Sequence, residues 1–237
     1  AGEQAVNEFL SRGAFPGLIK TGHTEALHQL YTEILCKDAV IAGGIRDRNT
    51  LQRMALHLIT NTGEHVTANK LREKLKIKAV STAAEHMQCI ETAGLVRFVS
   101  ILSDNPARQA VNPRKVYAVD TALAAAVSTA ETVDRNKLFE TMLFNHLCRE
   151  SRSVCYTNEQ GGCDFIASDA EGGVRCIQAC YDDDPDLMQT KTDGLLWALR
   201  QTGSSRGTIV TADQNDRIDA ENFEIEVIDA DTFLGGY

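Results

Sequence analysis

KLFETMLFNHL (residues 137–147) and GGCDFIASDAEGGVRCIQAC (residues 161–180) are the two stretches that decide how the second half of this chain is expected to fold. The first has the apolar spacing of a helix and carries Glu140, and the second contains two apolar strands joined by a glycine-rich turn. Asp164 opens the first of these strands, and Gln178 lies inside the second. The sequence thus predicts one helical glutamate and two polar strand residues on neighbouring elements of one sheet.

This layout resembles the core of PD-(D/E)xK nucleases, in which acidic groups on adjoining strands bind Mg²⁺ and a lysine helps to activate water. The resemblance implies a candidate catalytic set of Glu140, Asp164 and Gln178. It also implies incomplete chemistry, because Gln178 is neutral where an acid is expected and Cys180 stands at the lysine position. Since Mg²⁺ prefers carboxylate ligands, we expect a degenerate site and no bound metal. Whether Lys191, on the following helix, replaces the missing lysine is left open by the sequence.

Charge is divided unevenly along the chain. Residues 46–115 carry 12 lysines and arginines against 6 aspartates and glutamates, whereas residues 116–237 carry 9 against 22. The formal net charge of −9 therefore hides a basic middle segment. An excess of basic side chains is typical of surfaces that contact nucleic acid. We expect such contact in the middle segment, because the acidic last segment would repel a phosphate backbone.

Other patterns limit the class of protein. The seven cysteines form no CxxC pair, which favours reduced thiols in a cytoplasmic protein over disulfides or a zinc site. No apolar run approaches the roughly 20 residues of a membrane span, and no signal peptide opens the sequence. GLIKTGHT (residues 17–24) has the spacing of a phosphate-binding loop, but His23 replaces its lysine. We therefore expect no cofactor and no ATP hydrolysis by this chain alone.

The order of elements predicted for the basic middle segment, residues 46–118, is that of a winged helix-turn-helix domain. Three helices are followed by two strands. The third helix would enter a major groove. Lysines and arginines would contact phosphates, and serine, threonine and histidine would reach base edges. The helices are expected at DRNTLQRMALHLITNTG (47–63), TANKLREKLKI (67–77) and AVSTAAEHMQCIETAGLV (79–96), and the strands at LVRFVSIL (95–102) and RKVYAVD (114–120). The candidate nucleic-acid-binding residues are Lys70, Arg72, Lys74, Lys76, Lys78, Ser81, Thr82, His86, Arg114 and Lys115.

Eight segments, spread in order over nearly the whole chain, share a resemblance to one family. They are FLSRGAFPG (9–17), YTEILCKDAV (31–40), LREKLKI (71–77), STAAEHMQCIETAGLV (81–96), KVYAVDTAL (115–123), LFETMLFNHL (138–147), CDFIAS (163–168) and IQACYDDDP (177–185). Together they resemble the C-terminal region of prokaryotic AAA-type ATPases, in which a winged helix precedes a restriction-endonuclease-like domain of unknown function.

The resemblance implies an organisation and a set of partners. Residues 1–45 would be a helical linker from an ATPase module, residues 46–118 the winged helix, and residues 119–237 a restriction-endonuclease-like domain with a mixed sheet. The overall fold class would be α/β (α+β), and ATP would bind on the upstream module only. Gly162 stands where family members often have an acid, which weakens the expectation of metal binding further.

Three hypotheses for function follow. The leading one is a non-catalytic module of an AAA-type ATPase, which binds double-stranded DNA or another partner and carries a degenerate nuclease-like domain. The second is a Mg²⁺-dependent nuclease that uses Glu140 and Asp164. The third is a protein-interaction or dimerisation module without DNA contact. Salt-sensitive DNA binding would separate the first from the third, because phosphate contacts weaken as salt rises.

Overall fold

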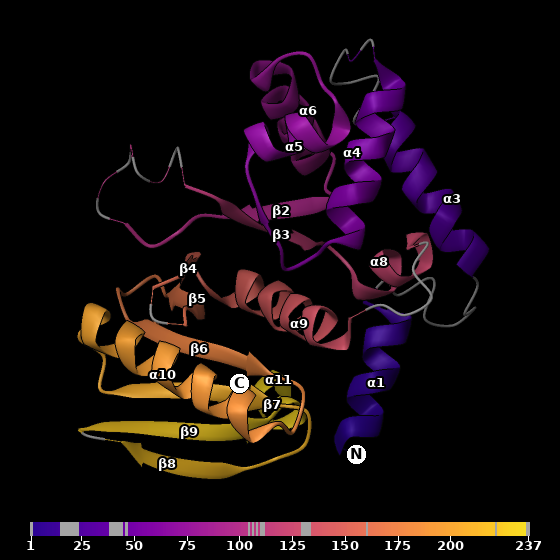
Figure 1. Cartoon of the computed structure of the whole chain (residues 1–237). Helices are drawn as coiled ribbons and strands as arrows, with labels where there is room; N and C mark the ends of the chain where they lie inside the picture. Colours follow the sequence, from indigo (N-terminus) through magenta and orange to yellow (C-terminus); the bar gives the residue numbers. More distant parts are fainter. Residues whose placement is uncertain are drawn as a thin grey trace. The chain divides into compact units, whose positions relative to one another are not determined.

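The computed structural model is a mixed α and β fold with two sheets, in agreement with the expected fold class (Figure 1). It describes residues 2–14, 24–37, 45, 47–103, 105, 107, 109, 112–128, 134–159, 161–220 and 222–235. The phosphate-loop-like residues 17–23 lie outside this part of the chain. The contacts divide the chain into two units, which are described one at a time.

The first of these, here called the three-stranded unit, comprises Ser11–Val99 and Ala110–Asp134. Its sheet has the order β1-β3-β2, and both strand pairs are antiparallel. Its helices are α3 (Thr24–Ile34), α4 (Arg48–Thr60), α5 (Ala68–Leu75), α6 (Val80–Thr92) and α8 (Thr121–Val127), and its strands are β1 (His65–Val66), β2 (Val96–Val99) and β3 (Arg114–Ala118).

Local sequence explains where these helices begin. The side chain of Thr67 accepts a hydrogen bond from the backbone N–H of Lys70 and so caps α5, as expected of a threonine at that position. Asp47 caps α4 and Asp120 caps α8 in the same way. The buried residues of α4 are Leu51, Met54, Ala55, Leu58 and Ile59, which share one face of the helix. The helices expected at 47–63, 67–77 and 79–96 therefore form, each beginning one residue later and ending two to four residues earlier than expected.

The other unit, here called the six-stranded unit, comprises Ala1–Leu10, Ser100–Gln109 and Arg135–Tyr237. Its sheet has the order β4-β5-β6-β7-β9-β8, in which β6, β7 and β9 are parallel and the remaining pairs are antiparallel. Its elements are α1 (Gly2–Arg12), α9 (Arg135–Glu150), β4 (Ser153–Thr157), β5 (Cys163–Ser168), β6 (Val174–Cys180), α10 (Pro185–Thr202), β7 (Arg206–Thr211), β8 (Asp216–Ala220), β9 (Phe223–Asp229) and α11 (Ala230–Gly235).

Helices α9 and α10 cover opposite faces of this sheet (Figure 1). The ring of Phe165 on β5 stacks on Phe144 of α9, with 6.2 Å between ring centroids. The next residue, Ile166, belongs to the apolar cluster that includes Leu195 and Leu199 of α10. Because successive residues of a strand point to opposite faces, these contacts assign one face of the sheet to each helix.

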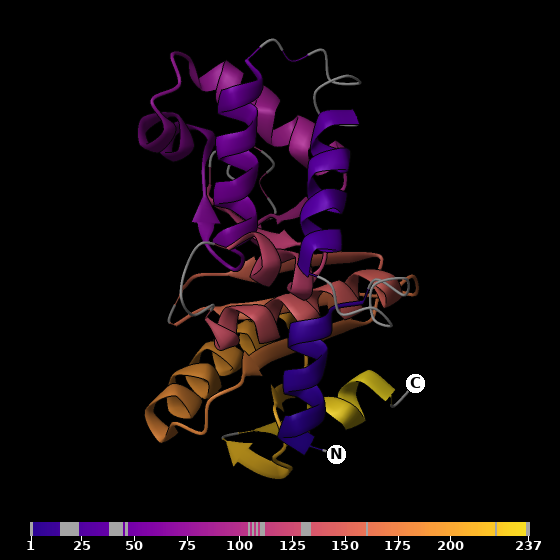
Figure 2. The same ribbon diagram turned by 90° about the vertical axis from the view of Figure 1, so that its right-hand side faces the viewer.

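Helix α1 packs with the six-stranded unit, although more than 120 residues separate it from α9 (Figure 2). The hydroxyl of Tyr181 donates a hydrogen bond of 2.8 Å to Oδ1 of Asn7, and Arg135 donates a second bond of 2.8 Å to the same oxygen. Val6 and Leu10 on the same helix are each 3% exposed. The units therefore differ from the expected segments, because α1 groups with 135–237 and α8 groups with the three-stranded unit.

Candidate functional site

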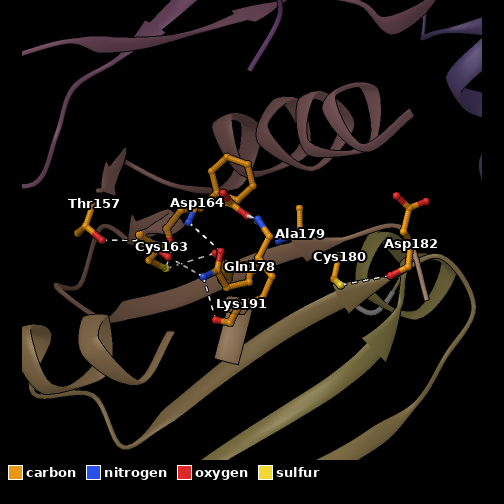
Figure 3. Close-up of polar contacts among 11 residues, drawn as sticks. Thr157, Cys163, Asp164, Gln178, Ala179, Cys180, Asp182 and Lys191 are labelled. Carbon is orange, nitrogen blue, oxygen red and sulfur yellow. Dashed lines mark hydrogen bonds and ion pairs between the residues drawn. The ribbon is translucent and has the colours of Figure 1, made fainter. Parts of the chain in front are cut away.

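Gln178 lies on β6 and holds four segments of backbone together (Figure 3). Its Oε1 accepts the backbone N–H of Asp164 at 3.1 Å. Its Nε2 donates to the carbonyl of Gly162 at 2.8 Å and to the carbonyl of Lys191 at 3.0 Å. Both N–H groups of the amide are thus used, and the residue is 1% exposed. The side chain of Gln178 on β6 thus links β5, the turn that precedes β5 and α10 through hydrogen bonds to their backbone.

Asp164 is placed at the start of β5, as expected, and its carboxylate is held by two donors. Oδ2 accepts the backbone N–H of Ala179 at 3.0 Å and lies 2.5 Å from Nζ of Lys191. The side chain of Asp164 is 9% exposed and that of Lys191 is 19% exposed. The structure therefore brings the lysine of α10, which the sequence left as an open question, into an ion pair with the strand aspartate (Figure 3).

Two glycines, Gly162 in the turn and Gly194 on α10, shape the backbone in front of this aspartate. Gly162 has a φ of +76°, and a Cβ added there would lie 2.6 Å from the carbonyl oxygen of Thr157. A Cβ added at Gly194 of α10 would lie 1.9 Å from the carbonyl oxygen of Gly162. Such an approach needs glycine on both sides. The absence of an acid at position 162 thus has a structural cause, because the backbone that positions Gln178 leaves no room for a side chain there.

Cys180, which the sequence resemblance set at a lysine position, is not a reactive thiol. It is 1% exposed, and its Sγ donates to the carbonyl of Asp182 at 3.5 Å. Burial raises the pKa of the Cys180 thiol, and the nearby ammonium of Lys191 opposes that rise only in part. Because the thiolate is the nucleophilic form, Cys180 is expected to stay protonated and inert at neutral pH.

Glu140 lies on α9 and is half-buried. It precedes Phe144 by four residues, so both share the face of α9 that packs on the sheet. Within the described ranges, however, no group of three or more histidine, cysteine, aspartate or glutamate side chains is close enough to hold a metal ion. Glu140 and Asp164 are thus not completed by a third such ligand.

The donor set does not fit Mg²⁺ well. A magnesium ion takes near-octahedral oxygen ligands, usually carboxylates together with waters. Oδ2 of Asp164 already carries the ammonium of Lys191, which brings the positive charge that a metal ion would supply. The Oε1 of Gln178 is directed to the backbone N–H of Asp164. These contacts describe a closed polar cluster with an internal counter-ion.

A second candidate surface lies on the three-stranded unit, where α5 meets α6. Four lysines and one serine are exposed there, whereas Thr82 and Arg72 are half-buried. Arg72 is held by Glu73, with 3.0 Å between the guanidinium and carboxylate atoms, and its Nε donates to Asn69. Its charge is thus partly neutralised within α5. The exposed set, here called the α5–α6 corner, consists of Lys70, Lys74, Lys76, Lys78 and Ser81.

Lys76 is the single non-glycine residue with a left-handed backbone in the part of the chain that the structure describes. Its φ is 56° and its ψ is 42°, and its backbone N–H donates to the carbonyl of Glu73 at the end of α5. Helices commonly end on glycine in this conformation, since a side chain there costs about 1–2 kcal/mol. The chain thus keeps a lysine where glycine would fold more easily.

Two residues of the expected nucleic-acid-binding set are not on the surface. His86 is 2% exposed, because the spacing of α6 turns it inward beside Ala83, Met87 and Ile90. Lys115 is 7% exposed on the central strand β3. The expectation that these two side chains contact DNA is therefore corrected.

Arg114, at the start of β3, is half-buried, and its guanidinium lies 4.5 Å from the ring centroid of Phe98. This cation–π contact uses the side chain within the unit. Among the described candidate residues, the exposed cations are those of the α5–α6 corner.

The sequence reading missed Gly194, which sits inside α10 and lets the turn at Gly162 approach. A glycine within a helical pattern is a recognised sign of close backbone packing, so KTDGLLWAL (residues 191–199) contained the signal. It also missed the hydrogen bonds of Gln178 to the backbone of three other segments, because a glutamine in an apolar strand carries no sequence signal for which groups it will bond.

Comparison with known proteins gives a family without a described function. A family model described as a domain of unknown function, DUF8612, matches residues 3–134, which is more than half of the chain. No curated protein and no solved structure matches the sequence. In the described part of the chain, no helix is long and apolar enough to cross a membrane. The family description carries no link to ATPases, winged helices or nucleases. The chain belongs to the DUF8612 family of domains of unknown function.

Proposed function

We propose that this chain is a non-catalytic module that binds double-stranded DNA through the α5–α6 corner and works with an AAA-type ATPase. In the proposal, the three-stranded unit is a winged helix-turn-helix domain and the six-stranded unit a nuclease-like scaffold without nuclease chemistry. The order α4-β1-α5-α6-β2-β3 supports the first part. So does the turn between α5 and α6, residues 76–79, which has the length usual in helix-turn-helix pairs.

The observation that carries the proposal is the left-handed Lys76. Backbone strain tends to be kept where it serves a function, and a lysine at the turn before a recognition helix is well placed to contact phosphate. Replacing Lys76 by glycine should stabilise the unit by about 1 kcal/mol, because the strain is removed. The same change should weaken DNA binding, since one phosphate contact is lost. A residue kept only for folding would not show these opposite effects.

The surrounding charges also support the proposal. Lys70, Lys74 and Lys78 are exposed around Lys76, and a set of four lysines can displace several counterions from duplex DNA. Two acids oppose them, because Glu73 and Glu85 are exposed on the same two helices. Glu73 is engaged by Arg72, which reduces its repulsion of a phosphate. The net balance at the corner remains positive.

A second candidate, a Mg²⁺-dependent nuclease that uses Glu140 and Asp164, is favoured by one observation. The ammonium of Lys191 lies 2.5 Å from Asp164, so the missing lysine function could be supplied from α10. Against it stand the amide of Gln178, which is committed to backbone partners, and the buried Cys180. Asp164→Ala would decide between the two, because a nuclease would lose Mg²⁺-dependent cleavage of duplex DNA while a binding module would keep its DNA affinity.

The test of the leading proposal is fluorescence anisotropy of a labelled DNA duplex over a range of salt, with and without Mg²⁺. We expect binding whose affinity falls steeply from about 50 to about 200 mM salt. The variant K74E/K76E/K78E should bind at least about tenfold more weakly and lower the slope of log K against log salt by about 2 to 3.

A matched control separates the corner from net charge. K37E/R206E/R217E changes the charge by the same amount at three exposed positions that do not belong to the corner. It should bind almost as well as the unchanged chain. Equal losses in both variants would make the effect one of net charge, and no binding by any of them at low salt would favour the protein-interaction module.

A further inference from the structure

Strand β8 forms an open edge of the six-stranded sheet (Figure 1). Among the described residues, the strand pairings place nothing on its outer side. The opposite edge, β4, is covered, because the N–H of Leu102 donates to the carbonyl of Tyr156 at 2.7 Å and the N–H of Tyr156 donates to the carbonyl of Ser100 at 3.2 Å. An open edge can take up a further strand, so β8 is where this sheet can be extended.

The pairing of β8 with β9 shows which backbone groups face this edge. In an antiparallel ladder, only alternate residue pairs exchange backbone hydrogen bonds. Asp219 lies opposite Glu224 in the register, but the N–H of Glu224 donates to the carbonyl of Ser205, on the β7 side, at 3.1 Å. The N–H of Arg217 donates to the neighbouring side chain, Oδ1 of Asp216, at 2.8 Å. The backbone N–H and C=O groups of Arg217 and Asp219 are therefore directed to the outer edge.

Exposed charges of both signs lie on one face of this edge. Asp219 and Glu224 are directly opposite each other, and two like charges in that position repel. Nε of Arg217 lies 3.3 Å from Oδ1 of Asp219, and its Nη1 lies 3.1 Å from Oε1 of Glu224. One guanidinium thus serves two carboxylates, while the side chains of Arg217 and Asp219 remain 62% and 76% exposed. A second guanidinium beside Asp219 would balance these charges.

An apolar side chain lies between these charges on the other face of the sheet. Ile218 points away from the face of its two neighbours and packs against the apolar cluster that includes Leu195 of α10 and Ile225 of β9. It is half-buried, as are Ala220 and Phe223 on the same hairpin. Another apolar side chain set against Ile218 would extend this cluster past the present edge of the sheet.

We propose that β8 pairs with β8 of a second copy of this chain, antiparallel and about a two-fold axis beside Ile218. Arg217 of each copy then lies opposite Asp219 of the other, with both backbone hydrogen bonds formed. Each Asp219 gains a guanidinium of its own, and the two Ile218 side chains meet at the closer, non-hydrogen-bonded position. The order Arg-Ile-Asp is its own complement when the strand is reversed, whereas edge charges of a single sign would oppose such pairing.

The contact uses the same patch on both copies, so it closes at two chains. It joins the two sheets into one and belongs to the six-stranded unit alone, so it does not depend on DNA binding. A strand-to-strand contact is a small interface. We therefore expect a weak dimer, with a dissociation constant on the order of 10–100 μM.

Sedimentation equilibrium of the full chain, from about 5 to about 500 μM, tests this inference. The average mass should rise with concentration from that of one chain toward that of two. Asp219→Arg sets like charges opposite each other on both sides of the two-fold axis and should weaken the dimer at least about tenfold. Within the chain the same change gives Glu224 an opposite charge, so the fold is kept. The double variant R217D/D219R restores opposite charges and should return the dissociation constant to within about threefold of its original value.

A matched control separates the edge from net charge. Asp193→Arg makes the same change of charge at an exposed position of α10 and should leave the dimer unchanged. A monomer at every concentration would overturn the inference. So would a dimer that Asp219→Arg weakens no more than Asp193→Arg does, or one that the double variant fails to restore.

The register is tested by disulfide cross-linking. In a Cys36→Ser background, which removes an exposed native thiol, Ile218→Cys sets two thiols opposite each other with Cα atoms about 4.5 Å apart, a distance that a disulfide spans. An added oxidant should join two copies of this variant. Asp216→Cys would lie opposite Ala220 of the second copy, so its two thiols are well separated and should cross-link far more slowly. Equal rates at the two positions would refute the proposed register.

Discussion

Replacing Lys191 by methionine would test how strongly the ion pair with Asp164 holds the six-stranded unit together. Methionine keeps most of the volume and apolar stem of lysine, so the change removes mainly the charge. It leaves the carboxylate of Asp164, 9% exposed, without its ammonium partner. Removal of one member of a buried ion pair costs about 3–5 kcal/mol, and the 19% exposure of the lysine side chain favours the lower end, about 3 kcal/mol.

The assay is urea unfolding followed by the fluorescence of Trp197, the single tryptophan of the chain. Trp197 lies on α10 and packs against the apolar cluster of the six-stranded sheet, so its signal reports on the unit that contains the pair. Asp164→Asn and the double variant D164N/K191M complete a double-mutant cycle. Since the double variant buries no unpaired charge, we expect it to cost only about 1 kcal/mol more than Asp164→Asn.

The reasoning predicts a coupling free energy of about 2 kcal/mol between the two residues. Effects of the two single substitutions that add to within about 0.5 kcal/mol would refute it, because additivity means that the side chains do not interact. A loss for Lys191→Met below about 1 kcal/mol would likewise show that the pair behaves as an exposed surface ion pair.

Three other predictions concern packing, pH and thiol chemistry. Gly194→Ala should destabilise the six-stranded unit by at least about 2 kcal/mol, since the added methyl meets the carbonyl of Gly162; unchanged urea unfolding would contradict this. Burial lowers the pKa of His86 below its ordinary 6.5, so the unfolded chain binds this proton more readily. Stability should therefore fall as pH drops below about 6.5, and His86→Leu should reduce that fall in thermal unfolding scans. A thiol reagent should modify the exposed Cys36 rapidly and Cys163, whose pKa is raised by burial, only on unfolding; fast labelling of both would refute the burial argument.

Local signals made much of the fold predictable. Thr67 at a helix start, Gly94 after a helix end and the apolar spacing of residues 137–147 each act within one or two turns of chain. Those elements form close to the expected positions. The candidate pair Asp164 and Gln178 was also identifiable, because both are polar residues in otherwise apolar strands.

Long-range contacts were not predictable from the sequence alone. The docking of α1 depends on Asn7 meeting Tyr181, and the pairing of Leu102 with β4 depends on its backbone N–H meeting the carbonyl of Tyr156. Neither pair leaves a periodic signal, since each joins segments that lie far apart in the sequence. The two-residue strand β1 is likewise too short to produce an alternating pattern.

The misplacement of His86 has a different cause. Helical spacing assigns residues to a face, but which face of α6 is buried depends on the neighbours that pack against it. Ser81 lies on the exposed face, and His86 lies with Met87 and Ile90 on the buried one. A histidine is more often exposed than buried, so its residue type favours the DNA-facing side of α6. Packing against the rest of the unit places it on the buried side instead.

The bonds of Gln178 bear on whether an acidic metal site could be built at this end of the sheet. A glutamate at 178 would direct a carboxylate oxygen at the carbonyl oxygens of Gly162 and Lys191, where the amide now donates two hydrogen bonds. An acid at 162 would meet the carbonyl of Thr157. Each single substitution is thus opposed by the backbone that surrounds it. A designer who wanted carboxylates here would have to change several positions together, including the backbone of the turn at Gly162.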